Sequence, residues 1–292
     1  VVSGTMGNLV ALLSHCGRGD EIIMGHLAHT FLYEAGGVAA LGGIHSHTLP
    51  NLPNGMLDPQ DVENAIRDPQ NVHHPRSRVI CLENTHNRCG GAVLSPAQMA
   101  TIKAIADRHG LAVHLDGARI FHAAIALGID VKEIAAQADS VQLCFSKGLA
   151  APVGSAICGS ADFIREARRN RKMVGGGMRQ AGIIAAAAIV ALEQMVDRLA
   201  DDHENARRLA AGLAEINGVT IDPAAVQSNI VVFGLADPTI SLPQVSQALA
   251  AKGIKINPID KAHFRAVTHY GVEREDIDRT LIAIRETLVE LA

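Results

Sequence analysis

Short apolar runs that alternate with helical patterns restrict the fold of this sequence more than any other feature. Within the first 160 residues these runs are Glu21–Met24, Val79–Leu82, Leu111–Leu115 and Val141–Phe145. Ser95–His109 lies between two of the runs, begins with Ser-Pro and is followed by Gly110, as is typical of a capped helix. This alternation predicts an α/β fold with a mostly parallel sheet.

The second half of the chain changes character. Helical apolar spacing from about Met178 to about Ile216 predicts one long helix that bridges two domains. Its most apolar part, Gly182 to Met195, is shorter than the roughly 20 residues of a membrane span, so a buried helix is expected there. Further strands are expected at Asn229–Phe233 and Arg265–Thr268, and helices at Pro243–Lys252 and Arg274–Leu291. We expect a large domain over 1–195 and a small α+β domain over 196–292.

The composition argues against several classes of function. The 292 residues carry 26 basic and 30 acidic side chains, a net charge of −4, which argues against nucleic-acid binding. The five cysteines are odd in number and lack C-x-x-C spacing, which favours a reducing, cytoplasmic location. The fourteen histidines follow no known zinc-binding spacing, so no metal site is predicted. No membrane partner is expected.

Lys147 is the first candidate for chemistry. It stands in Ser146-Lys147-Gly148, directly after an apolar run and before small apolar residues that extend to Gly154. A lysine at a strand end in such surroundings is partly desolvated, and its amine is then nucleophilic towards an aldehyde. The alternative is a solvated loop lysine.

Asp116 is the second candidate, and it ends the apolar run before that of Lys147. In open α/β sheets, ligands bind at the carboxyl ends of the strands, so both side chains are expected at the same edge. A carboxylate there can keep a pyridine nitrogen protonated. The alternative is that Asp116 caps the next helix.

The third candidate is the glycine-containing segment Gly4-Thr5-Met6-Gly7-Asn8, which leads into an expected helix at Leu9–Leu13. Small residues at a helix N-terminus leave backbone N–H groups free, and the helix dipole favours an anion such as phosphate. The alternative is an ordinary helix start. The three candidates supply partners for a phosphate, a ring nitrogen and an aldehyde, in the chain order of fold type I pyridoxal-phosphate enzymes.

Seven stretches give the chain a closer resemblance. They are Gly4 to Ala11, Ala28-His29-Thr30, Glu34-Ala35-Gly36-Gly37, Leu82 to Asn87, His114 to Arg119, Ser146 to Leu149 and Gly175 to Gln180. Through these stretches the chain resembles the low-specificity L-threonine aldolase family over nearly its whole length. The resemblance implies a fold type I, aspartate aminotransferase-like large domain with a small α+β C-terminal domain.

The resemblance also implies pyridoxal 5′-phosphate as cofactor, bound covalently by Lys147. Asp116 would pair with the pyridine nitrogen, and Arg119 with the ring's phenolic oxygen. His29 would stack on the pyridine face, although a half-exposed histidine at a helix start is the alternative. The residues implied at the phosphate are Gly4, Thr5, Lys172 and Arg179, although part of the basic run 165–172 must be a solvated helix face.

The implied substrates are L-threonine, L-allo-threonine and related β-hydroxy-α-amino acids, cleaved reversibly to glycine and an aldehyde. Arg265 would bind the substrate carboxylate through its guanidinium fork. His86 would lie near the β-hydroxyl group and is the first candidate for the base, with His29, or a water that either positions, as the second. Alternatively, His86 is a loop histidine whose ring is satisfied by the backbone.

Other functions stay open from the sequence. A pyridoxal-phosphate-dependent β-eliminating lyase or racemase has the same fold, and a non-catalytic homologue is a further alternative. The joint presence of Lys147, Asp116 and Arg119 counts against the non-catalytic alternative. The resemblance implies a homo-oligomer, a dimer or tetramer. Family members begin with a further segment containing Arg-Ser-Asp-Thr, and we expect the start at Val1 to lie inside a longer protein.

Overall fold

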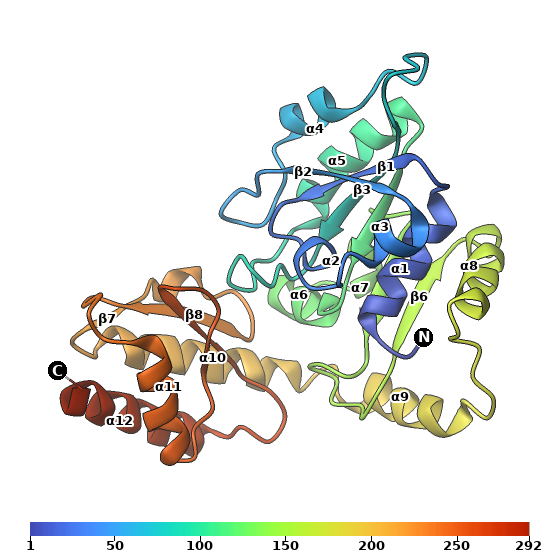
Figure 1. The fold of residues 1–292 in the computed structure, drawn as a ribbon. Coiled ribbons are helices and arrows are strands. Elements are labelled where there is room, and N and C mark those ends of the chain that lie inside the picture. Colours follow the sequence, from blue (N-terminus) through green and yellow to red (C-terminus); the bar gives the residue numbers. More distant parts are fainter. Residues whose placement is uncertain (292) are drawn as a thin grey trace. The chain divides into compact units, whose positions relative to one another are not determined.

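A computed structural model of the protein describes residues 1–291 and divides into two compact units (Figure 1). The first unit comprises Val1–Cys89 and Val93–Asp197. The second comprises Gly90–Ala92 and the chain from Arg198 onward. Each unit has its own sheet and its own apolar core.

The first unit is built on a six-stranded sheet in the order β2-β1-β3-β4-β5-β6. Neighbouring strands are parallel except for β5 and β6. The strands are β1 (Asp20–Gly25), β2 (His45–Leu49), β3 (Arg76–Glu83), β4 (Ala112–Asp116), β5 (Ser140–Cys144) and β6 (Ser155–Gly159). The predicted α/β fold with a mostly parallel sheet is therefore confirmed.

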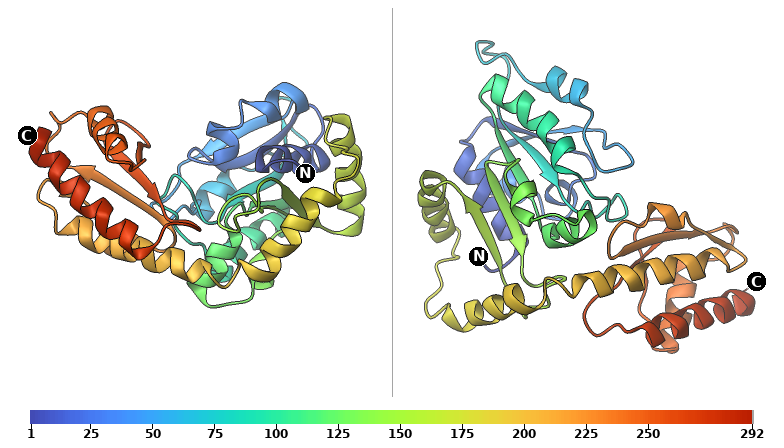
Figure 2. Two further views of the ribbon diagram at one scale, coloured as in Figure 1. Left: turned by 90° about the horizontal axis from the view of Figure 1, so that it is seen from below. Right: turned by 180° about the vertical axis from the view of Figure 1, so that it is seen from behind.

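Helices cover both faces of this sheet (Figure 2). In β1, Ile22 packs into the core that contains Leu12 of α1, whereas Ile23 packs into the core that contains Met99 of α5. Burial on both faces explains why the central strands read as continuous apolar runs. The helices are α1 (Gly4–His15), α2 (His29–Leu32), α3 (Gly37–Gly42), α4 (Pro59–Ala65), α5 (Pro96–His109), α6 (Ile120–Leu127), α7 (Val131–Ala135), α8 (Ala161–Met173) and α9 (Gly182–Gln194).

Helix α5 forms as its end signals predict. The Ser95 hydroxyl accepts a hydrogen bond from the Gln98 N–H, and the Gln98 side chain accepts one from the Ser95 N–H. Gly110 ends the helix in the left-handed region, with φ of 66°. A capped helix between two strands thus fixes the crossover from β3 to β4.

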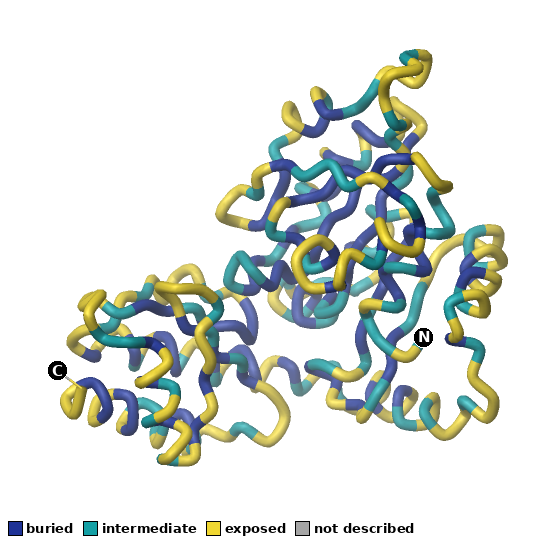
Figure 3. The backbone as a smooth tube through the Cα atoms, viewed as in Figure 1, coloured by how far each residue is buried: buried dark blue, intermediate teal, exposed yellow. Residues whose placement is uncertain are grey.

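The prediction of one long helix from Met178 to Ile216 is wrong. Helix α9 ends at Gln194, and α10 (Leu199–Ala214) begins after a break. The prediction that the apolar stretch is buried is also wrong for this chain by itself, since Ile183 is 83% and Ile189 54% exposed. Figure 3 shows exposed turns along α9, which lies there as in Figure 1. Alanine-rich sequence supports helix in both segments, so composition alone did not reveal the break.

The second unit has a four-stranded antiparallel sheet in the order β7-β8-β10-β9. Its core includes Leu209, Phe233, Phe264 and Ile284. The predicted strands and helices are present as β8, β10, α11 and α12. The elements are β7 (Val219–Thr220), a 3₁₀ turn (Pro223–Ala225), β8 (Ile230–Leu235), α11 (Leu242–Ala251), β9 (Asn257–Pro258), β10 (His263–Val267) and α12 (Arg274–Leu291). Within residues 1–291, no helix has the length and apolarity to cross a membrane.

Candidate active site

The first turn of α1 lies against β5. The helix begins at Gly4, earlier than the predicted Leu9, because the Ser3 hydroxyl caps it by accepting the Met6 N–H at 3.2 Å. A Cβ atom on Gly4 would lie 2.9 Å from the Cys144 sulfur, so only glycine permits this approach. Gly4 and Thr5 therefore stand beside the end of the strand that leads to Lys147.

Asp116 is the last residue of β4 and is buried. Its Oδ2 accepts a hydrogen bond of 2.8 Å from the Asn8 side-chain amide, and its Oδ1 accepts the Ala118 N–H at 3.1 Å. Helix α6 starts at Ile120 with Arg119 at the N-cap position. Asp116 is thus not the cap of α6, and its carboxylate is oriented by two donors at the carboxyl end of the sheet.

His29 begins α2 and is paired with Glu34. Its Nδ1 lies 2.9 Å from Glu34 Oε1, and the side chains are 29% and 2% exposed. Glu34 Oε1 also accepts a hydrogen bond of 2.8 Å from the Asn8 amide. One ring nitrogen of His29 and one carboxylate oxygen each of Glu34 and Asp116 lie within 4.8 Å of one another. The Asn8 amide therefore joins the histidine pair to Asp116.

The charges around His29 form one electrostatic group. The hydrogen bond that His29 donates to Glu34 raises the pKa of His29, and the Asp116 charge acts in the same direction, while burial and the Lys147 charge lower it. Burial raises the pKa of Glu34, whose Oε2 is buried without a hydrogen-bond partner in the described chain. An amine, an imidazole and two carboxylates thus act on one another at this edge of the sheet.

Lys147 is half-buried and lies just beyond β5. A turn fixes its backbone: the Ala150 N–H donates to the Lys147 carbonyl at 2.9 Å, and Ala150 has a φ of 56°. Because β4 and β5 are parallel neighbours, the residues after them emerge at the same edge, as predicted for Asp116 and Lys147.

The glycine run between α8 and α9 lies against the start of α1. A Cβ atom on Gly176 would overlap the Met6 side chain, and one on Gly177 would lie 2.7 Å from Lys172 Cδ. Lys172 and Arg179, at either side of this run, are exposed. The structure therefore brings the glycine run and the Lys172 side chain into the neighbourhood of the α1 N-terminus.

His86 has different surroundings. It follows β3, is 1% exposed, and its ring nitrogens lie 3.3 Å from the Cys89 N–H nitrogen and from the Asn51 amide nitrogen. Glu83 connects it to His29, since Glu83 Oε2 accepts the His29 N–H at 2.8 Å and lies 4.0 Å from His86 Nε2. Two N–H groups thus face the buried ring, and a neutral imidazole can accept a hydrogen bond from only one of them.

Arg119 and Arg265 complete the predicted set. Arg119 is half-buried and lies at the N-cap position of α6, three residues after Asp116. Arg265 is half-buried on β10 of the second unit. The first unit therefore contains every predicted site residue except Arg265.

Sequence reasoning gave no role to Asn8 or Glu34. Asn8 is a polar residue in an apolar helix, yet it is only 1% exposed, and a buried amide of this kind must find partners. His114 is a further buried polar residue that precedes Asp116 by two positions, so both side chains point to the same face of β4. Two polar residues at alternate positions of β4, together with a polar residue in the apolar helix α1, are the sequence signal that could have located this cluster of side chains.

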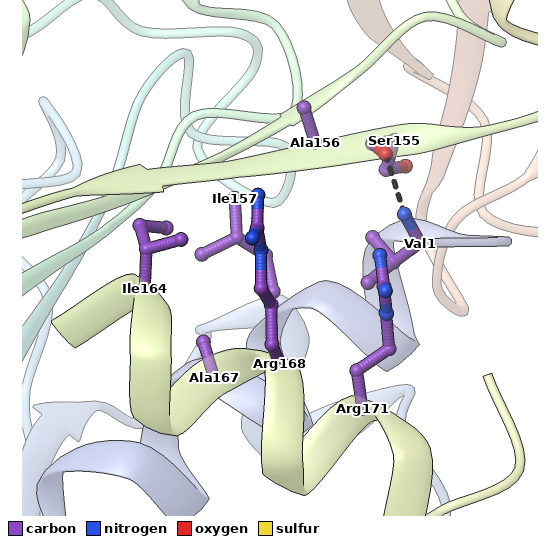
Figure 4. Close-up of a pocket in the computed structure, with 8 residues that line it drawn as sticks. All are labelled: Val1, Ser155, Ala156, Ile157, Ile164, Ala167, Arg168 and Arg171. Carbon is purple, nitrogen blue, oxygen red and sulfur yellow. Dashed lines mark hydrogen bonds between the residues drawn. The ribbon is translucent and has the colours of Figure 1, made fainter. Parts of the chain in front are cut away.

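A cavity of about 230 Å³ between β6 and α8 contains none of the predicted residues (Figure 4). Arg168 and Arg171 extend from α8 along it, and the Val1 amine donates to the Ser155 carbonyl at 3.0 Å. These two arginines thus belong to the helix face next to β6, where Arg168 is exposed and Arg171 is half-buried.

The residues present fit pyridoxal 5′-phosphate. Asp116 is a buried carboxylate held by two N–H donors, which suits a protonated ring nitrogen. Lys147 offers a half-buried amine, and the α1 N-terminus offers N–H groups to a phosphate. The fold and these side chains together define a fold type I pyridoxal-phosphate-dependent enzyme.

Comparisons with known proteins agree. Residues 1–236 match the beta-eliminating lyase family. The chain is 42% identical to low specificity L-threonine aldolase of Escherichia coli, over 94% of this chain and 79% of that protein. It is also 42% identical to low-specificity L-threonine aldolase 1 of Arabidopsis thaliana, over 100% of this chain and 82% of that protein. The chain therefore belongs to the low-specificity L-threonine aldolase family within the beta-eliminating lyases.

Solved structures show the same fold. Leishmania major threonine aldolase matches with a TM-score of 0.82 and 23% identity, over 98% of this chain and 82% of that one. Serine palmitoyltransferase of Sphingomonas wittichii matches with a TM-score of 0.75 and 22% identity, over 100% and 72% of the two chains. The resemblance predicted from the motifs is confirmed, as are the lyase class and the family's cofactor, pyridoxal 5′-phosphate.

Proposed function

We propose that this protein is a pyridoxal-phosphate-dependent aldolase that cleaves L-threonine, L-allo-threonine and related β-hydroxy-α-amino acids reversibly to glycine and an aldehyde. Its relatives carry the name of this activity. The observation that carries the proposal to this chain is the electrostatic group of Asp116, His29 and Lys147 at the carboxyl edge of the sheet.

The cofactor's binding residues follow from this arrangement. Lys147 would bind it through its amine, Asp116 would pair with the ring nitrogen, and Arg119 would bond the phenolic oxygen. The phosphate would be held by Gly4, Thr5, Lys172 and Arg179. When bound, the cofactor supplies an electron sink for the electron pair of the substrate's Cα–Cβ bond.

The remaining steps belong to the side chains. Asp116 would hold the proton at the ring nitrogen, since two N–H donors orient its carboxylate at this edge of the sheet. Arg265 would orient the substrate by its carboxylate. A base must then accept the proton of the β-hydroxyl group before an aldehyde can leave.

His29 is the better candidate for that base, directly or through a water. Its Nδ1 faces Glu34, so Nε2 is left for substrate, and its ring is partly exposed. A ring so placed can also stack on the pyridine face. His86, which the resemblance favoured, is 1% exposed and faces N–H groups of Cys89 and Asn51 inside the protein. We infer that His86 supports the loop after β3 instead.

A β-eliminating lyase is the second candidate function, since the matched family carries that description. Elimination takes a proton from Cα and expels hydroxide from Cβ, and a racemase takes and returns only the Cα proton. The test incubates the holoenzyme with L-threonine and L-allo-threonine. Acetaldehyde is measured with alcohol dehydrogenase, in parallel with ammonia, 2-oxobutanoate and the Cα epimers of the two substrates. Acetaldehyde and glycine in equal amounts are expected. Ammonia with 2-oxobutanoate, or only D-allo-threonine from L-threonine and D-threonine from L-allo-threonine, would contradict the aldolase.

We also propose a cytoplasmic homo-oligomer, a dimer or tetramer. The apolar side chains exposed on α9, among them Ile183 and Ile189, support an association surface. The five cysteines are unpaired, which supports a reducing compartment. Light scattering after size exclusion should give a mass of two or four chains, and a monomer at micromolar concentration would contradict the proposal.

A further inference from the structure

A continuous line of hydrogen bonds leads away from Asp116 and Glu34 into the protein. His114 Nε2 lies 3.1 Å from Asn8 Oδ1, and His114 Nδ1 lies 2.9 Å from the Ser140 hydroxyl. The same hydroxyl lies 2.8 Å from His15 Nε2. His114, Asn8 and Ser140 are each 1% exposed, so water does not compete for these bonds.

The two carboxylates fix the direction of every bond in this line. The Asn8 Nδ2 group faces Glu34 Oε1 and Asp116 Oδ2, both at 2.8 Å, and these oxygens act as acceptors. Asn8 must therefore direct its NH₂ group to them and its Oδ1 to His114. An Oδ1 atom only accepts, so His114 Nε2 must carry a hydrogen.

The other nitrogen of His114 follows. Burial lowers the pKa of His114 to about 4, and the neighbouring His15 acts in the same direction, while Asp116 opposes it. The ring is therefore neutral at pH 7, with a lone pair on Nδ1. Ser140 must donate its single hydroxyl hydrogen to that lone pair, and His15 Nε2–H must donate to Ser140.

We propose that His114 is a positioning residue for the cofactor site and acts through Asn8. In its neutral Nε2–H form, it holds the Asn8 amide with the NH₂ group on Asp116 and Glu34. The opposite tautomer would place a lone pair against Oδ1 and favour a turned amide, whose oxygen would then face two carboxylates. His114 thus keeps the Asp116 carboxylate aligned for a ring nitrogen.

The role of His114 in cofactor binding rests on the proposed function, whereas its tautomer and its hydrogen bonds do not. The first test is therefore nitrogen NMR of ¹⁵N-histidine-labelled wild-type protein without cofactor. His114 should have a protonated Nε2 and an unprotonated Nδ1, and should not titrate between about pH 5 and 8. A protonated Nδ1, or titration near the ordinary histidine pKa, would overturn the inference. The measurement needs no variant to fold.

The second test titrates pyridoxal 5′-phosphate into wild type, His114→Phe, His114→Gln and His203→Phe, following the visible absorbance of the bound cofactor. His203 is the matched control, because it is also buried and has a pKa lowered to about 4 by burial, but belongs to the second unit. His114→Phe should bind about tenfold to a hundredfold more weakly, because the Asn8 amide loses the partner that holds its hydrogen bonds to the two carboxylates. His114→Gln, which restores a donor, should recover part of the affinity, and His203→Phe should resemble wild type.

The outcomes separate the two proposals. Wild-type affinity in His114→Phe, or equal weakening in His203→Phe, would overturn the positioning role. Wild-type protein that binds no pyridoxal 5′-phosphate while His114 has the expected tautomer would overturn the proposed function and leave the hydrogen-bond line intact.

Discussion

Two histidines beside buried glutamates have opposite surroundings. His29 is partly exposed and lies 2.9 Å from Glu34, whereas His86 is 1% exposed and lies 4.0 Å from Glu83. Glu83 is occupied by the backbone N–H groups of His29 and Asn87. We infer that the first pair leaves a ring nitrogen for a ligand and that the second supports a loop. The family resemblance implied roles for both histidines, and their different surroundings are the basis for proposing different roles.

The largest expected effect comes from removal of the Lys147 amine, which the comparison pairs with His29. Lys147 acts electrostatically on His29. Lys147→Ala should reduce turnover by a factor on the order of 10³ or more, since the cofactor would lose its covalent attachment. Borohydride treatment of wild-type holoenzyme, followed by peptide mass mapping, should place the cofactor on Lys147. Lys132→Ala, on α7, is the control, and an adduct on any other lysine would break the comparison.

Replacement of the two histidines compares them directly. His29→Asn should lower kcat/KM by about 10² to 10⁴, the usual contribution of a positioned base. His86→Asn should change kcat/KM by less than about tenfold but should lower the melting temperature, because it leaves a cavity and unpaired neighbours. Steady-state kinetics and thermal unfolding of both variants provide the check. A folded His86→Asn protein with the larger kinetic loss would restore His86 as the base.

Asp116→Asn should fold nearly as wild type and should slow turnover by at least about tenfold, or roughly 1.4 kcal/mol in the barrier. A neutral amide cannot hold the proton at a ring nitrogen, although it has the shape of the carboxylate. Circular dichroism monitors folding and the acetaldehyde assay monitors rate. A loss smaller than tenfold would leave Asp116 with only a local structural role.

The smallest expected effect is a change in pH dependence. His29 must be unprotonated to accept a proton, so activity should rise with pH through its pKa. The hydrogen bond that His29 donates to Glu34 is the main cause that raises this pKa. The charge of Asp116 also raises it, whereas burial and the charge of Lys147 lower it. In Glu34→Gln, the acid limb of the kcat/KM profile should move to lower pH. An unchanged limb would mean that His29 does not control it.

Much of the fold could be predicted because its central strands are buried on both faces. β1 and β3 carry unbroken apolar runs, whereas β2 at the edge reads His45-Ser46-His47-Thr48-Leu49 and gave no such signal. The apolar residues of α9 predicted a buried helix. A periodic pattern, however, does not specify whether the same chain or another one covers that helix. Edge position and partner contacts are properties of the assembled protein, not of a local window.

The candidate site was predicted in part for the same reason. Asp116 and Lys147 follow adjacent strands, so the sheet itself brings them together. The burial of His86 depends on Gly55, where a Cβ atom would lie 2.7 Å from His86 Cβ, and that approach joins segments 31 positions apart. The Asn8 contacts similarly reach Glu34, 26 positions away, and Asp116, 108 positions away. Local patterns do not encode such pairings.

The single amide of Asn8 has a consequence for how this site can change. Because one NH₂ group serves both Glu34 and Asp116, a substitution at either carboxylate alters the hydrogen bond of the other. Energies of substitutions at these three positions should therefore not add, and double-mutant cycles should show coupling. Directed evolution that reshapes the His29 side of the site for new aldehydes will thus meet epistasis from the cofactor side, and compensating changes should concentrate around α1.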